Sequence, residues 1–178
     1  MGRNGRTYDF GYKLHISIDP CRILPLAGVL APANENEKRH GPSLIERTKQ
    51  LLRKAGARLR SLIADSQYSS ERMRRLAGEA VIPYPSNQRQ GEDVLRVDRK
   101  FRTYGPEEQR LKYHKQPSVE SAYAFLKTQY GMTVNKVRGL KKVAVYALYS
   151  ILCHVLMREA AENIGRPEKA VSPTFFNM

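Results

Sequence analysis

Two carboxylates stand at positions from which a sheet and a helix can present them to a metal ion. The first, Asp65, directly follows a short apolar segment, residues 59–64, that has the composition of a buried strand. Ligands gather at the carboxyl ends of strands in open α/β sheets, and carboxylate oxygens are donors that suit Mg²⁺. A turn or helix-capping role explains the same position. Asp65 is therefore a candidate metal ligand, with a structural role as the alternative.

The second carboxylate, Glu120, lies where a loop enters a predicted helix. Pro117 suits a first helical turn, and apolar residues at helical spacing after it form one face. Lys127 follows Glu120 by seven residues, which is two turns, so both side chains lie on one side of the helix. A solvated glutamate favoured by the helix dipole is the alternative interpretation.

The charge of the chain indicates what it binds. Lys and Arg number 31 against 17 Asp and Glu, and the formal net charge is +14. Residues 38–75 hold eleven basic side chains against three acidic ones, and residues 127–142 hold five and no acid. Positive stripes on a folded surface favour the backbone of duplex DNA. A ribosome-associated protein or a merely basic soluble protein is the alternative.

Cysteine, histidine and apolar patterns argue against several other classes. Cys21 and Cys153 are not in a CxxC motif, and the four histidines lack ligand spacing, so zinc and a disulfide framework are not expected. The first eight residues lack the apolar stretch of a signal peptide. The apolar run 143–157 is shorter than a membrane span needs, and we expect a buried core helix there. We therefore expect a cytoplasmic protein, associated with the nucleoid, and no membrane partner.

Periodicity predicts a mixed α/β protein. Strands are expected at 12–19, 22–30, 59–64 and 80–84, and all four are expected to form one sheet. Helices are expected at 43–55, 70–77, 118–130 and 141–163. We predict one domain over residues 1–164, with 86–116 as an insertion or long loop that has little core, and a loose C-terminal tail at 165–178.

The segment around Glu120 resembles the Tyr-Arg-Glu-Lys signature of DDE transposases from prokaryotic insertion sequences. That signature is Tyr, two residues, Arg, three residues, Glu, six residues, Lys. The chain has Tyr113, Gln116, Glu120 and Lys127 at this spacing, with Gln116 in place of the Arg. The substitution removes a charge but keeps a donor, and it puts the affinity for phosphate at that position in doubt.

Three further segments resemble the same family in the same order. Residues 64–70 resemble its Ala-Asp-x-x-Tyr-x-Ser motif around the second catalytic Asp, which here is Asp65. Residues 10–15 resemble its Tyr-Gly-Tyr-Lys-x-His segment, which contains Lys13. Residues 33–37 resemble its Gly-Asn-x-x-Asp turn, with Glu37 in the acidic place. The resemblance covers about residues 10–157, and four weak motifs in the right order are together specific.

The resemblance implies a ribonuclease H-like fold, similar to retroviral integrases, in which a mixed sheet has flanking helices. It implies DNA strand cleavage and transfer at insertion-sequence ends, with two Mg²⁺ ions held by three carboxylates. Asp65 and Glu120 would be the second and third catalytic residues and metal ligands. The partner implied is double-stranded DNA, and a homo-oligomer is possible. The expected DNA contacts are Lys127, Tyr113, Gln116 and Lys13.

The first catalytic Asp of the family belongs on a strand before residues 12–19, and only eleven residues precede that segment here. Asp9 and Asp19 are the nearby acids, and neither suits the position. We therefore expect an N-terminally truncated chain that lacks the first strand and is inactive by itself. Two alternatives remain: an inactive DNA-binding remnant that competes with full-length transposase, or a ribonuclease H-like nuclease.

Overall fold

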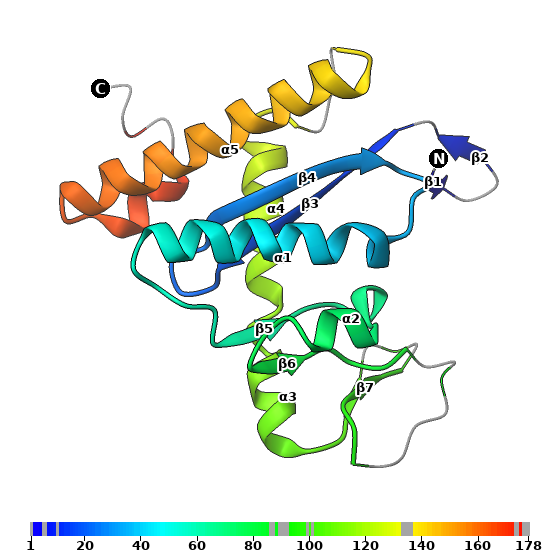
Figure 1. The fold of residues 1–178 in the computed structure, drawn as a ribbon. Coiled ribbons are helices and arrows are strands. Elements are labelled where there is room, and N and C mark those ends of the chain that lie inside the picture. The colour runs from blue at the N-terminus through cyan, green and yellow to red at the C-terminus, as the bar shows by residue number, and fades with distance from the viewer. Residues whose placement is uncertain are drawn as a thin grey trace. The chain divides into compact units, whose positions relative to one another are not determined.

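The middle of the sequence and its two ends build separate units in the computed structural model (Figure 1). Unit 1 comprises Met1–Asn34 and Ser118–Met178, and unit 2 comprises Glu35–Pro117. For residues 2–4 and 7–9 the structure describes the backbone alone. It otherwise describes all residues except 1, 5, 6, 10, 86, 87, 89–92, 99, 101, 133–136, 173, 174 and 176–178.

An antiparallel hairpin forms the centre of unit 1. Strand β3 (Tyr12–Asp19) pairs with β4 (Leu24–Pro32), and a short hairpin of β1 (Gly2–Asn4) and β2 (Thr7–Asp9) precedes it. The register shifts between Ser17 and Ile18, opposite the part of β4 that contains Pro25. Since proline cannot donate a ladder hydrogen bond, it is tolerated at such an irregularity. The strands expected at 12–19 and 22–30 are thus present, the second with bounds of Leu24–Pro32, and they pair with each other.

Two helices pack on this hairpin (Figure 1). Helix α4 (Pro117–Thr128) contributes Ala122 and Leu126, both fully buried, to a core with Ile16 of β3. Helix α5 (Leu140–Asn163) packs against β4, and a Cβ at Gly28 would lie 3.4 Å from the side chain of Ile151, in ordinary van der Waals contact.

The C-terminal end of α5 is tied to the hairpin turn by polar contacts. Arg22 donates hydrogen bonds to Glu162 and, at 2.9 Å, to Glu159. The Nε2 of His154 donates to the carbonyl of Ile23 at 3.0 Å. Ile23 has φ of 50°, which is strained for a β-branched residue. Packing of Ile23 in the unit 1 core and its bond to His154 oppose this strain.

The segment after α5 was predicted to be a loose tail. Its described part contains the 3₁₀ helix η2 (Pro167–Val171), which packs on α5 and buries Ala170 completely. Packing against α5 thus gives this part of the segment a defined structure.

Unit 2 is built around a short parallel strand pair covered by helix α1 (Glu37–Lys54). Strand β5 (Ser61–Ile63) pairs with β6 (Glu79–Val81), and helix α2 (Glu71–Arg74) lies between them in the chain. The core of this unit consists of Ile45, Leu62, Met73 and Ile82. Because this core shares no residue with that of unit 1, each unit has its own apolar interior.

Gly41 lets two elements of unit 2 approach each other. A Cβ at this position would lie 2.8 Å from the sulfur of Met73 and 2.9 Å from the Tyr68 ring. Gly41 and the following Pro42 are inside α1, which begins six residues before the predicted start at 43. The side chain of Asn36 caps this earlier start by accepting a hydrogen bond from the Lys38 amide.

The region predicted as an insertion contains β7 (Arg96–Val97), β8 (Thr103–Tyr104) and helix α3 (Glu107–Tyr113). Leu95 is only 2% exposed, and Lys112 of α3 donates to Glu79, the first residue of β6. The region therefore contains short elements instead of one continuous loop, but Leu95 is the only buried residue among its described positions, so it contributes little core. Short elements dispersed among charged residues carry too weak a periodicity to be predicted.

The prediction of a single sheet is wrong. Among the described residues, hydrogen bonds join the strands only in pairs: β1 with β2, β3 with β4, β5 with β6, and β7 with β8. The parallel pair is three residues long and belongs to unit 2, whereas the β3–β4 hairpin belongs to unit 1. The mixed α/β class is confirmed.

Candidate catalytic carboxylates

Asp65 follows β5 in unit 2 and begins a 3₁₀ turn, η1 (Ser66–Tyr68). Its Oδ1 accepts hydrogen bonds from the backbone amide of Gln67 and from the hydroxyl of Ser66, both at 3.0 Å. The capping role proposed as the alternative is therefore present. The carboxylate is half-buried, and both of these hydrogen bonds use Oδ1. Its Oδ2 is therefore available to another ligand while Oδ1 caps the turn.

The loop after Asp65 is held by a single arginine. Arg74 donates to the hydroxyl of Ser69 and to the carbonyl of Ile82, each at 2.7 Å. Its guanidinium also lies 3.9 Å from the centroid of the Tyr84 ring. These contacts join the Asp65 loop to the segment that follows β6. The sequence did not predict this role, because all three partners come from loops.

Glu120 occupies the first turn of α4 in unit 1, and its side chain is exposed. No described residue donates a hydrogen bond to its carboxylate or forms an ion pair with it. Lys127 lies two turns later on the same helix and is exposed as well. The helix therefore presents a carboxylate and an ammonium group to solvent on one side, as the spacing predicted.

Apolar packing fixes the orientation of α4. Ala122 and Leu126 are buried, and the hydroxyl of Tyr123 donates to the carbonyl of Leu14 in β3. Burial raises the pKa of Tyr123 to about 12, so the phenol stays neutral and keeps donating. Because this face is turned to the core, Glu120 must lie off it.

The remaining signature residues lie at and beside the junction of α3 and α4. Tyr113 ends α3, and the amide of Gln116 donates to its carbonyl at 2.9 Å, closing a turn before Pro117. Lys13 is half-buried in β3, where it pairs with Ala31 of β4. Phe10, which starts the motif around Lys13, lies outside the described residues. Contacts of these side chains with DNA stay predictions.

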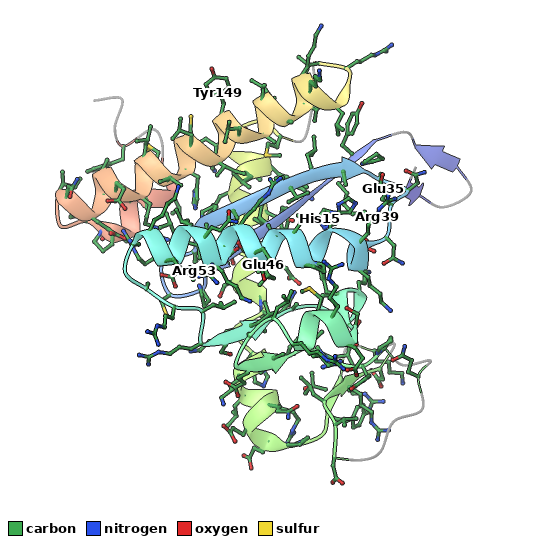
Figure 2. All side chains as sticks on the ribbon, viewed as in Figure 1. His15, Glu35, Arg39, Glu46, Arg53 and Tyr149 are labelled. Carbon is green, nitrogen blue, oxygen red and sulfur yellow. The ribbon has the colours of Figure 1, made fainter. Side chains whose placement is uncertain are left out.

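The acidic turn before α1 contains a group of charged contacts that the sequence did not predict. The carboxylate of Glu35 lies 2.6 Å from Nε2 of His40 and 3.8 Å from the guanidinium of Arg39. Figure 2 shows Glu35 and Arg39 together at the start of α1. Glu37 is the first residue of the helix, so the motif builds a helix N-terminus.

The two candidate carboxylates belong to different units, Asp65 to unit 2 and Glu120 to unit 1. Their convergence on one metal therefore stays a prediction. Among the described residues, no group of three or more His, Cys, Asp or Glu side chains is placed to hold a metal ion. Asp19, one of the acids near the expected first catalytic position, accepts from the Cys21 amide at 2.9 Å and closes the hairpin turn.

The comparison with protein families agrees with these motifs. A family model described as "Transposase DDE domain" matches residues 2–156. Because the match covers most of the chain, this protein belongs to the DDE transposase family. No curated protein and no solved structure matches the chain. The family assignment made from the four motifs is thus confirmed, and the family acts on DNA.

Proposed function

We propose that this chain belongs to the catalytic part of an insertion-sequence transposase with a ribonuclease H-like core. Its activity in the intact enzyme is metal-dependent cleavage and transfer of DNA strands at the ends of the element. The family match carries this proposal. The loop after β5 supports it further, because this loop presents Asp65 at the carboxyl end of a parallel strand. Such strand ends are where open α/β sheets bind their ligands.

The donor chemistry of the two carboxylates fits Mg²⁺. The Oδ2 of Asp65 and both oxygens of Glu120 are hard anionic donors, the type that this cation prefers. Two bound Mg²⁺ ions supply activation of the attacking oxygen and stabilisation of the leaving oxygen in phosphoryl transfer. Two carboxylates balance only part of the charge of two such ions. A third ligand, the first Asp of the family, is required for full activity.

The other signature residues and Lys13 bind the DNA backbone in this proposal. Lys127, two turns from Glu120, neutralises a phosphate near the cleaved bond. Tyr113 and Gln116 donate hydrogen bonds to the same strand, and Lys13 contacts a second phosphate. The net charge of +14 supports duplex DNA as the partner and the nucleoid as the place of action.

A double-mutant cycle on metal binding tests whether Asp65 and Glu120 share an ion. Residues 1–178 are titrated with Mn²⁺, and binding is followed by water-proton relaxation. We expect Asp65→Asn and Glu120→Gln each to weaken binding about tenfold or more. If both residues hold one ion, the double variant will be little weaker than either single variant, because interacting sites are not additive.

The matched control is Glu46→Gln, which removes a partly exposed helix carboxylate bound to Lys49 (Figure 2). It should leave Mn²⁺ affinity unchanged. The Asp65→Asn variant keeps an oxygen that can accept from Gln67, so the loop keeps its cap. Mn²⁺ binding that survives both substitutions, or two effects that simply add, would contradict the proposed shared site.

A further inference from the structure

Helix α5 is apolar on two opposite sides, and only one of them is used inside unit 1. Its buried residues face the hairpin and α4. On the opposite side five large apolar side chains are about half exposed or more. They are Val145 (52%), Leu148 (64%), Tyr149 (63%), Leu152 (46%) and Leu156 (58%), and we call them the outer stripe. Their spacing of three or four residues places them on one line along the helix.

Figure 2 shows Tyr149 pointing away from the β3–β4 hairpin. An apolar patch of a few hundred Å² is at the upper end of what monomeric proteins expose, and such patches mark interaction surfaces. The expectation of a buried core helix therefore holds for one face of α5 only. The outer stripe needs a partner that covers it.

A membrane is one possible cover, because α5 is a helix among the described residues that is long and apolar enough to cross one. The contacts within unit 1 argue against insertion. His154, Ser150 and Ala147 are buried, and Arg22 holds Glu159 and Glu162 at the end of the helix. Crossing a bilayer would break these contacts and place buried polar groups in lipid.

Charges at the two ends of the stripe identify a better partner. Lys141 and Lys142 lie at its N-terminal end, where α5 has no acidic residue in the first turn. Glu159 lies at the C-terminal end and is exposed, and it shares the single guanidinium of Arg22 with Glu162. A second α5 in antiparallel orientation would place the lysines of each helix next to the glutamate of the other. A parallel orientation would place like charges together.

We propose that the outer stripe is the contact surface of an antiparallel dimer of this chain through α5. The midpoint of the stripe lies between Ser150 and Ile151. Residues equidistant from it and on the same edge of the stripe face each other across the two-fold axis: Val145 faces Leu156, Tyr149 faces Leu152, and Lys141 lies next to Glu159. Antiparallel helices also oppose their dipoles favourably. This inference is independent of the metal site.

Five partly exposed side chains are expected to cover less than the roughly 800 Å² per partner of a standard stable interface, so we expect a weak dimer. Sedimentation velocity between about 1 and 200 µM tests it, in about 0.3 M salt to screen the general repulsion of two basic chains. We expect the mass to rise from 20.3 kDa toward twice that value. The variant Leu148→Glu, Leu152→Glu should stay monomeric throughout.

Leu111→Glu is the matched control, because Leu111 is 61% exposed on α3 and lies outside the stripe. It should dimerise like the unmodified chain, and circular dichroism verifies that each variant is folded. A chain that stays monomeric throughout this range, with or without binding to anionic lipid vesicles, overturns the proposal. Dimerisation that survives the double substitution overturns it too.

Disulfide trapping tests the antiparallel register. Cys21 and Cys153 are both exposed, so both are first replaced by serine. In this background the double variant Val145→Cys, Leu156→Cys should form a covalent dimer under mild oxidation, because position 145 of each copy faces position 156 of the other. Each single variant should stay uncross-linked. A cross-link in either single variant would join a position to itself, which indicates parallel helices and overturns the arrangement.

Discussion

The two units hold their candidate carboxylates by different means. In unit 2, hydrogen bonds and one stacked guanidinium hold the loop that carries Asp65. In unit 1, Glu120 is placed by a helix whose opposite face is buried through Ala122 and Leu126. Polar contacts are directional and local, whereas apolar burial contributes more free energy and is spread over the whole element.

This difference predicts that stability and site geometry can be disturbed separately. Loss of a buried side chain in α4 should weaken all of unit 1. Loss of the arginine contacts in unit 2 should move the Asp65 loop and leave the core of Ile45 and Leu62 in place.

Leu126→Ala should be the most damaging of these changes. Leu126 is completely buried against Ile16, and truncation of such a leucine costs about 3 kcal/mol of unfolding free energy. Urea denaturation measures the loss, and hydrogen exchange should show lower protection in α4 and β3. Leu111→Ala, at a side chain 61% exposed, is the control with little effect. Equal loss of protection in β5 and β6 would show that the units do not unfold independently.

Arg74→Met should disturb the Asp65 loop with a smaller effect on overall stability. Methionine keeps most of the aliphatic volume but removes two hydrogen bonds and the stacking on Tyr84, together about 2 kcal/mol. Hydrogen exchange at residues 65–70 should rise, and Mn²⁺ affinity should fall with it.

Arg75→Met is the control for this change, since the Arg75 side chain is 81% exposed and pairs only with Glu71 among the described residues. It should alter neither exchange nor metal affinity. If Arg74→Met behaves like Arg75→Met, the guanidinium does not position the loop, and the contrast between the units is wrong for unit 2.

Acid should lower the stability of unit 1 through His154. Burial lowers the pKa of His154, and the nearby Arg158 lowers it further against the opposing effect of the Ile23 hydrogen bond. The native state therefore prefers neutral His154. Its contribution is fully present above the unfolded pKa of about 6.5 and is lost as the pH falls below that value toward the folded pKa.

Thermal unfolding measured from about pH 8 to 5 should show this loss as a decrease in melting temperature. The His154→Gln variant should show a flatter profile, because glutamine does not titrate. His114→Gln, at an exposed position after α3, should keep the original profile. Identical slopes for the unmodified chain and the His154→Gln variant would assign the acid sensitivity to other groups.

Local patterns in the sequence predicted most of the elements. Strand β3 has its predicted bounds, and α5 begins one residue before its predicted start, because both have strong and uninterrupted apolar patterns. The start of α1 was missed because Gly41 and Pro42 look like a loop. Their burial beside Met73 is a tertiary effect that outweighs their poor helix propensity.

Only the local part of the candidate site could be predicted from the sequence. Motif spacing identified Asp65, Glu120 and Lys127 as candidates, and their local settings at a strand end and on an exposed helix face are as expected. The pairing of the strands and the contacts that Arg74 makes with the Asp65 loop depend on which segments, distant in the sequence, come together in the fold. No periodicity within a single segment encodes that choice.

The composition of unit 1 from both ends of the sequence has a consequence during synthesis. The β3–β4 hairpin leaves the ribosome before all of unit 2, and α4 and α5, which cover it, are translated only afterwards. At roughly 5–20 residues per second, the apolar side of the nascent hairpin stays uncovered for several seconds. Unit 2 is one continuous segment of the chain and can fold during this time. The translation rate of the segment that encodes unit 2 therefore sets how long the Ile16 side chain stays exposed before α4 covers it. A longer exposure increases the need for a chaperone.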